Sequence, residues 1–155
     1  MSLLNLCYLS NIMENKFDQF ATLSAQISHI YASLASQYGL TLNELHVLYY
    51  IGSNGPSSPS EISKRWSLPK QTITSIGNKL AKKDYLYFST DPIDKRSKQI
   101  SLTDSGEKFV RPLIESITQS ELKTSREFGE EKFASLLKQL SQLQNLLAHN
   151  LNHKS

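Results

Sequence analysis

The sequence has few of the features that mark secreted, membrane or disulfide-rich proteins. Its single cysteine, Cys7, excludes an intramolecular disulfide and fits a reducing compartment. No apolar run approaches the length of about 20 residues that spans a bilayer, and the opening residues lack the basic start of a signal peptide. At 155 residues the chain is long enough for one domain and short for two. We therefore expect a cytoplasmic single-domain protein with no membrane partner.

Catalytic and metal-binding patterns are missing as well. There is no Gly-rich phosphate loop, no nucleophile elbow and no His/acid cluster at catalytic spacing, so we expect neither an enzyme nor a cofactor. His149 and His153 stand four residues apart, which suits a shared metal on a helix, but no cysteine or acidic cluster joins them. Cys7 has no basic neighbour in sequence that would stabilise a thiolate, which argues against a redox switch.

Positive charge is concentrated in the middle of the chain. Residues 64–98 contain nine basic and three acidic residues, a net charge of +6, whereas the whole chain carries only +3 and the remainder therefore −3. A basic middle between mildly acidic ends is the pattern expected of a surface that binds a polyanion. Charge alone fits a solvated surface equally well, so the interpretation depends on which elements carry it.

The N-terminal third predicts a long helix. Apolar residues recur at helical spacing from about Met13 to Tyr38, and Gly39 is a suitable terminator. We expect this helix to pack against more than its own subunit, because aromatic residues follow one stripe of it. Met13 is also an alternative start of the protein, with residues 1–12 as a loose leader.

Two capping boxes predict the next two helix starts. Thr41 with Glu44, and Ser58 with Glu61, each place a hydroxyl and a carboxylate three residues apart, so that each can bond the other's backbone N–H.

A short third helix and a tight turn follow. The third helix runs to about Trp66, whose ring we expect in the core. The connection 67–69 then leads into a fourth helix over about 69–83. Two short helices separated by so few residues indicate a helix-turn-helix. The inward positions of the fourth helix are predicted to be Ile73, Ile76 and Leu80, with Gly77 permitting close approach.

A β-hairpin is predicted directly after these helices. Residues 85–89 and 99–102 are β-prone, and a polar turn with a basic tip joins them, which is typical of the wing of a winged helix. Thr103 then caps a helix to about Phe128. After Gly129, leucines recur every three to four residues, a stripe that fits either a core-facing helix or association between subunits.

Two segments resemble the MarR family of bacterial regulators. Residues 91–106, DPIDKRSKQISLTDSG, are similar to the family's wing signature, and residues 68–74, LPKQTIT, to the start of its recognition helix. The resemblance extends over roughly residues 17–151. The chain departs from the family at Asp84, where relatives usually have glycine, and at Ile93, where many have another basic residue.

The resemblance implies a fold and an assembly. The fold would be mainly α with a small β-hairpin wing: a winged helix-turn-helix over residues 41–103, within one MarR-like domain spanning 1–155. Residues 13–38 and 107–151 would form long terminal helices that interlock two subunits into a homodimer. The family also implies a small-molecule effector in the cleft between the dimerisation and DNA-binding regions.

The fourth helix and the wing supply the expected contacts to DNA. On the helix, glutamine can pair with adenine, small hydroxyl residues can meet bases or phosphates, and lysine can neutralise phosphate. The candidates there are Lys70, Gln71, Thr72, Thr74, Ser75, Asn78 and Lys79. At the wing, Arg96 is expected to enter the minor groove, Asp94 to orient it, and Lys95 and Lys98 to contact phosphates. The alternatives are an ordinary amphipathic surface helix and a surface Asp–Arg pair that closes a hairpin.

These observations predict a sequence-specific regulator of transcription. It would bind double-stranded DNA as a homodimer on a pseudo-palindromic operator, would act as a repressor, and would be released by a small-molecule or stress signal. One alternative is a winged-helix module that binds proteins without specific DNA binding. Another, a small-molecule or metal-binding protein without a DNA role, is disfavoured because the +6 segment coincides with the predicted helix-turn-helix and wing.

Overall fold

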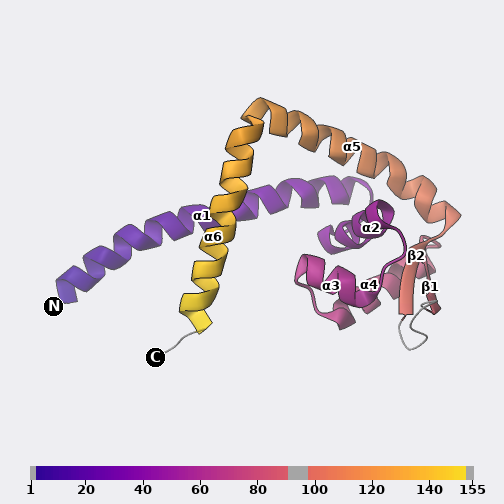
Figure 1. Ribbon diagram of the computed structural model, residues 1–155. Coiled ribbons are helices and arrows are strands. Elements are labelled where there is room, and N and C mark those ends of the chain that lie inside the picture. The colour runs from indigo at the N-terminus through magenta and orange to yellow at the C-terminus, as the bar shows by residue number, and fades with distance from the viewer. Residues whose placement is uncertain (1–2, 91–97, 153–155) are drawn as a thin grey trace. The chain divides into compact units, whose positions relative to one another are not determined.

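The computed structural model describes residues 3–90 and 98–152, and it is mainly helical with one β-hairpin, as predicted (Figure 1). In chain order its elements are α1 (Leu3–Gln37), α2 (Leu42–Asn54), α3 (Pro59–Trp66), α4 (Lys70–Lys82), β1 (Leu86–Thr90), β2 (Lys98–Leu102), α5 (Asp104–Phe128) and α6 (Glu130–Asn152). None of the described helices is both long and apolar enough to cross a membrane.

The first helix begins about ten residues earlier than predicted. The prediction placed its start near Met13, whereas α1 starts at Leu3. Leucine is a good helix former, and neither proline nor glycine occurs before Gly39, so nothing in the sequence interrupts the helix. Its end was predicted correctly: Gly39 has a φ of +66°, a left-handed conformation that favours glycine.

Both predicted capping boxes are present. The Thr41 backbone N–H donates to the Glu44 carboxylate at 2.7 Å, and the Glu44 N–H donates to the Thr41 hydroxyl at 3.3 Å. Ser58 and Glu61 repeat the arrangement at the start of α3, with the same two distances. These bonds satisfy backbone donors that the first turn of a helix would otherwise leave unpaired.

The turn between α3 and α4 is short and tightly bonded. Ser67 closes α3 in the left-handed conformation with a φ of +52°, and the Ser63 hydroxyl donates to the Leu68 carbonyl at 2.6 Å. Helix α4 then packs with its apolar side inward: Ile73 and Leu80 are fully buried. A Cβ at Gly77 would lie 2.7 Å from Phe88 Cζ, so the predicted close approach is confirmed.

The wing is an antiparallel hairpin of β1 and β2. Its register pairs Leu86 with Leu102 at one end and Thr90 with Lys98 at the other. Buried Ile100 also exchanges two backbone hydrogen bonds with Ser57, which ties the hairpin to the segment before α3. The wing tip, residues 91–97, lies outside the described residues.

Asp84 adopts a left-handed backbone conformation at the position where relatives usually have glycine. It has a φ of +59°, within the left-handed region that aspartate tolerates better than most residues. Its carboxylate accepts a hydrogen bond from the Ser105 hydroxyl at 2.9 Å, and its carbonyl accepts one from the Thr103 hydroxyl at 2.5 Å. The departure therefore preserves the turn into the first wing strand.

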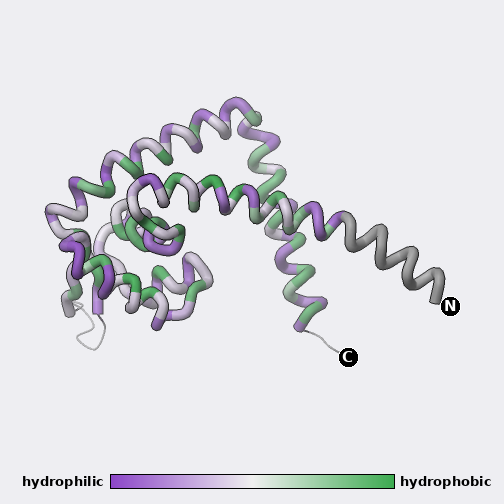
Figure 2. Tube along the Cα trace, turned by 180° about the vertical axis from the view of Figure 1, so that it is seen from behind, coloured by the Kyte–Doolittle hydropathy of each residue, from purple (hydrophilic) through white to green (hydrophobic). Residues whose placement is uncertain are grey.

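By its internal contacts the chain divides into two compact units, Met1–Glu107 and Lys108–Ser155. The first contains α1 and the winged helix, and its core is formed by residues such as Leu48, Ile62 and Ile100. The second contains most of α5 and all of α6, and α6 has no buried residue. Hydrophobic positions recur between hydrophilic ones along both helices (Figure 2).

Candidate nucleic-acid interface

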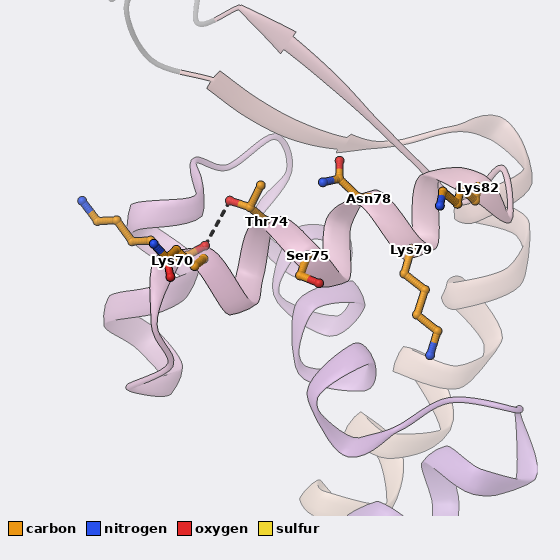
Figure 3. Close-up of a pocket in the computed structure, with 7 residues that line it drawn as sticks. Lys70, Thr74, Ser75, Asn78, Lys79 and Lys82 are labelled. Carbon is orange, nitrogen blue, oxygen red and sulfur yellow. Dashed lines mark hydrogen bonds between the residues drawn. The ribbon is translucent and has the colours of Figure 1, made fainter.

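The exposed side of α4 brings polar and basic side chains together on one face. Seven residues line a hollow of about 580 Å³ along this helix (Figure 3), and we call them the α4 polar face: Lys70, Gln71, Thr74, Ser75, Asn78, Lys79 and Lys82. Six of the seven are candidates predicted from the sequence. Thr72, also predicted, is half-buried and does not line the hollow.

The α4 polar face has the chemistry that duplex DNA requires. Gln71, Ser75 and Asn78 are exposed and carry donors and acceptors suited to base edges. The Thr74 hydroxyl donates to the Lys70 carbonyl at 3.0 Å, so its oxygen is left to act as an acceptor. Pro69 gives α4 no side-chain cap, which leaves the N–H groups of the first turn open to an anion.

Lys82 is the residue on this face that the sequence analysis missed. It follows Ser75 by seven positions and Asn78 by four, so helical spacing already places all three on one side. The prediction stopped at Lys79, although the stripe continues to the last residue of the helix.

Lys79 differs from the other basic residues of the face. Its Nζ lies 2.7 Å from Glu44 Oε1, and the Glu44 side chain is only 3% exposed. Figure 3 shows Lys79 extending from another side of α4 than Asn78, as the helical turn between neighbouring residues requires. This ammonium is therefore held by a carboxylate of the protein itself.

The wing candidates are only partly described. Lys98 begins β2 and is exposed, as a phosphate contact requires. Asp94, Lys95 and Arg96 lie outside the described residues, so their contacts stay predictions.

Trp66 packs against α2 and is half-buried. Its ring stacks on that of His46 with centroids 3.8 Å apart and planes 7° apart, and the Arg65 guanidinium lies 5.0 Å from its centroid. Burial, and then the charge of Arg65, lower the pKa of His46 below its ordinary value. The stack covers one face of the indole, which supports a structural role for Trp66.

In the described part of the chain, no three His, Cys, Asp or Glu side chains form a group that could hold a metal ion. His149 belongs to α6, whereas His153 lies outside the described residues.

A short helix, a tight turn, a second helix with an exposed polar face and a two-stranded hairpin together define a winged helix-turn-helix. Proteins of this class place the second helix in the major groove of DNA. The α4 polar face supplies the side chains for such a contact.

Comparisons with known proteins identify the family. The family model described as MarR family matches residues 38–97. The transcriptional regulator SarZ of Staphylococcus aureus is 30% identical over 135 residues, which are 86% of this chain and 87% of SarZ. The chain belongs to the MarR family.

Solved structures show the same fold. A MarR family regulator from Neisseria meningitidis is similar with a TM-score of 0.78 and 26% identity, covering 90% of this chain and 99% of that one. The Staphylococcus aureus MepR–DNA complex is similar with a TM-score of 0.68 and 23% identity, covering 83% and 95%. Because members of the family are transcription regulators, the protein is a DNA-binding regulator of transcription and not an enzyme.

Proposed function

We propose that the protein is a sequence-specific repressor that binds double-stranded DNA as a homodimer. The observation that carries the proposal is the α4 polar face, which offers base-reading and phosphate-binding side chains on the outer side of the second helix of the motif. The major groove admits an α-helix and presents a different donor and acceptor pattern for each base pair. Gln71 suits adenine, Thr74, Ser75 and Asn78 suit other base edges or phosphates, and Lys70 and Lys82 neutralise phosphates. Thr72, at the edge of the face, is the remaining predicted contact on α4, whereas Lys79, also predicted, is paired with Glu44 within the protein.

The wing would add contacts in the neighbouring minor groove. Lys98 begins β2 at the tip end of the hairpin, with its side chain exposed. Arg96 would enter the groove, where the negative potential favours a guanidinium, with Asp94 orienting it and Lys95 near a phosphate. Replacing Arg96 with alanine is expected to weaken operator binding by at least about fivefold, the value of one good contact, while dimerisation is unchanged. Unchanged DNA affinity in a titration would contradict the wing role.

Homodimerisation is supported by apolar surface on α1 and α6. Both helices expose large hydrophobic side chains that a monomeric protein rarely leaves in water. The exposed residues are Phe17, Phe20, Leu23, Ile27 and Ile30 on α1, and Phe133, Leu136, Leu137, Leu140, Leu146, Leu147 and Leu151 on α6. A two-fold dimer would place two α4 helices about 34 Å apart, in successive major grooves of a pseudo-palindromic operator.

Repression and its release complete the proposal. A dimer bound over a promoter blocks transcription. A small-molecule or stress signal would release it by favouring a conformation whose two α4 helices no longer match successive grooves. Such a regulator acts in the cytoplasm, where bacterial DNA lies.

Footprinting of the purified protein on fragments of its own genome tests the function. The expected result is protection of a few sites that share an inverted repeat, with affinity that falls steeply between 50 and 200 mM salt because phosphate-bound counterions are released. Mixed-sequence duplex of the same length is the control. Equal affinity for both would contradict specific regulation and favour a winged-helix protein-interaction module.

A further inference from the structure

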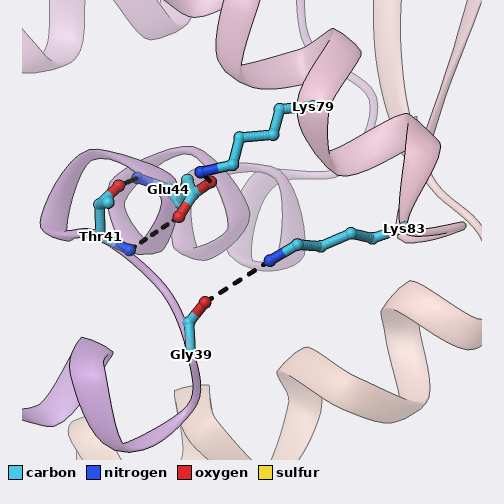
Figure 4. A network of polar contacts seen from close by, with 5 residues as sticks. All are labelled: Gly39, Thr41, Glu44, Lys79 and Lys83. Atoms are coloured by element: carbon cyan, nitrogen blue, oxygen red, sulfur yellow. Dashed lines mark hydrogen bonds and ion pairs between the residues drawn. The ribbon is translucent and has the colours of Figure 1, made fainter.

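A network of polar contacts joins the C-terminal end of α4 to the start of α2 (Figure 4). Lys79 Nζ lies 2.7 Å from Glu44 Oε1, while Glu44 Oε2 accepts the backbone N–H of Thr41 at 2.7 Å. Lys83, the residue that follows α4, donates from its Nζ to the Gly39 carbonyl at 3.5 Å. Two lysines of the basic segment therefore contact acceptors at the start of α2 and in the connection before it.

The Glu44 carboxylate depends on this network because it is almost completely buried. Its side chain is 3% exposed, whereas that of Lys79 is 59% exposed. Burial raises the pKa of Glu44, but the hydrogen bonds from Lys79 and Thr41 and the charge of Lys79 outweigh it, so the pKa lies below its ordinary value. If Lys79 moved to a DNA phosphate, a buried carboxylate would lose its counter-charge, which is unfavourable.

The second capping box shows that Glu44 does more than cap α2. Ser58 and Glu61 repeat the bonds of Thr41 and Glu44. Glu61 is nevertheless exposed, and in the described part of the chain it has no ion pair. The buried carboxylate and its lysine are therefore additional to what a cap requires.

We propose that Glu44 and Lys79 are positioning residues for DNA reading: their ion pair fixes α4 on α2, and Lys79 neutralises Glu44 rather than a phosphate. This inference rests on the proposed function. Lys82 also lines the α4 polar face, but it has no ion pair with another described residue. In contrast to Lys79, Lys82 is therefore the lysine that contacts a phosphate. Positioning acts on specificity, because base contacts need α4 at one depth and angle, whereas phosphate contacts supply affinity for any sequence.

The test compares four single variants of the full-length protein, Lys79→Met, Glu44→Gln, Lys82→Met and Glu61→Gln, and the double variant that combines Lys79→Met with Glu44→Gln. Glutamine keeps the cap acceptor at both glutamate positions, so Glu44→Gln removes the charge and Glu61→Gln is its matched control. Each variant is titrated with the footprinted fragment and with mixed-sequence duplex from 50 to 200 mM salt. Circular dichroism and a thermal melt of each protein confirm folding.

Lys82→Met is expected to weaken binding to both DNAs and to flatten the slope of log K against log salt by about 1.8, for one phosphate in each subunit of a dimer. Lys79→Met and Glu44→Gln should leave that slope unchanged and lower the ratio of specific to mixed-sequence affinity by at least about fivefold. The double variant of Lys79→Met with Glu44→Gln should lower this ratio no further than either single variant. Glu61→Gln should match the wild type.

Three results would overturn the inference. A slope that flattens in Lys79→Met as much as in Lys82→Met would make Lys79 a phosphate contact. An unchanged affinity ratio in Glu44→Gln, or a change of the same size in Glu61→Gln, would remove the positioning role. A wild-type protein that does not distinguish the two DNAs would overturn the proposed function together with the inference, whereas the first two results leave the proposed function intact.

Discussion

The winged helix and the terminal helices expose opposite kinds of surface. In α4, apolar residues such as Ile73 and Leu80 are fully buried and the polar side faces water. In α6 no residue is buried, and Leu137 and Leu151 are 52% and 66% exposed. The winged helix therefore completes its core within one chain, whereas α6 carries apolar surface that a single chain does not cover. The proposed DNA reading and the proposed dimer assembly therefore involve different surfaces, which separate variants can test.

The largest expected effect comes from placing a charge on the apolar surface of α6. Leu140→Asp would bury an unpaired carboxylate in each half of the proposed dimer, at a cost of roughly 3–5 kcal/mol per charge. We expect monomers in analytical ultracentrifugation and a loss of operator affinity of at least about a hundredfold, since two half-sites are no longer bound together. Gln142→Asp, on the polar side of the same helix, is the control. A Leu140→Asp protein that stays dimeric would contradict the role of this surface.

A packing defect where α5 meets the wing should have a smaller effect, and this effect should be on stability rather than on assembly. A Cβ at Gly106 would lie 2.0 Å from the backbone oxygen of Tyr85, so the backbone must shift to accept alanine. Gly106→Ala should lower the free energy of unfolding by roughly 1–3 kcal/mol in urea titrations, with the dimer still present at low denaturant. Gly52→Ala, in an exposed helical position of α2, is the control. Equal stability of the two variants would contradict a close contact between Gly106 and Tyr85.

The smallest expected effect is a loss of stability on acidification. The pKa of His46 is lowered by burial and by Arg65. Burial raises the pKa of Glu44, but the neighbouring Lys79 ammonium and the hydrogen bonds that Glu44 accepts outweigh it, so this pKa is also lowered. In both cases the folded protein binds the proton less readily than the unfolded chain. Stability is thus complete above the unfolded values, and it falls first as the pH drops below about 6.5 and again below about 4.3.

A series of urea titrations from about pH 3, below the unfolded value of Glu, to about pH 8 measures this dependence. His46→Phe keeps an aromatic ring against Trp66 without a titrating group, so it should remove the first step and leave the second. If His46→Phe showed the same loss near pH 6.5 as the wild type, another group would have to be responsible.

Local patterns in the sequence predicted much of this fold. The pairs Thr41–Glu44 and Ser58–Glu61 act within three residues, so their capping bonds could be foreseen. The α4 polar face follows from helical period once Ile73 and Leu80 are placed inward. These features depend on neighbours along the chain and not on the tertiary structure.

Features that depend on distant residues could not be predicted. The direction of Lys79 is set by Glu44, which lies on another helix and becomes buried only when α2 and α4 pack. The left-handed Asp84 is supported by Thr103 and Ser105, which arrive from beyond the wing. The early start of α1 at Leu3 was a different error: the prediction began the helix where apolar residues recur, near Met13, although the residues before it are also compatible with a helix.

The most direct test of the central claim, that the α4 polar face reads bases, is the affinity of Gln71→Ala for the footprinted operator relative to mixed-sequence duplex. A base contact predicts a fall in operator affinity of about 5- to 150-fold, the equivalent of 1–3 kcal/mol, with mixed-sequence binding nearly unchanged and with Gln142→Ala on α6 behaving as wild type. Equal losses on both DNAs, or no loss on either, would contradict the claim.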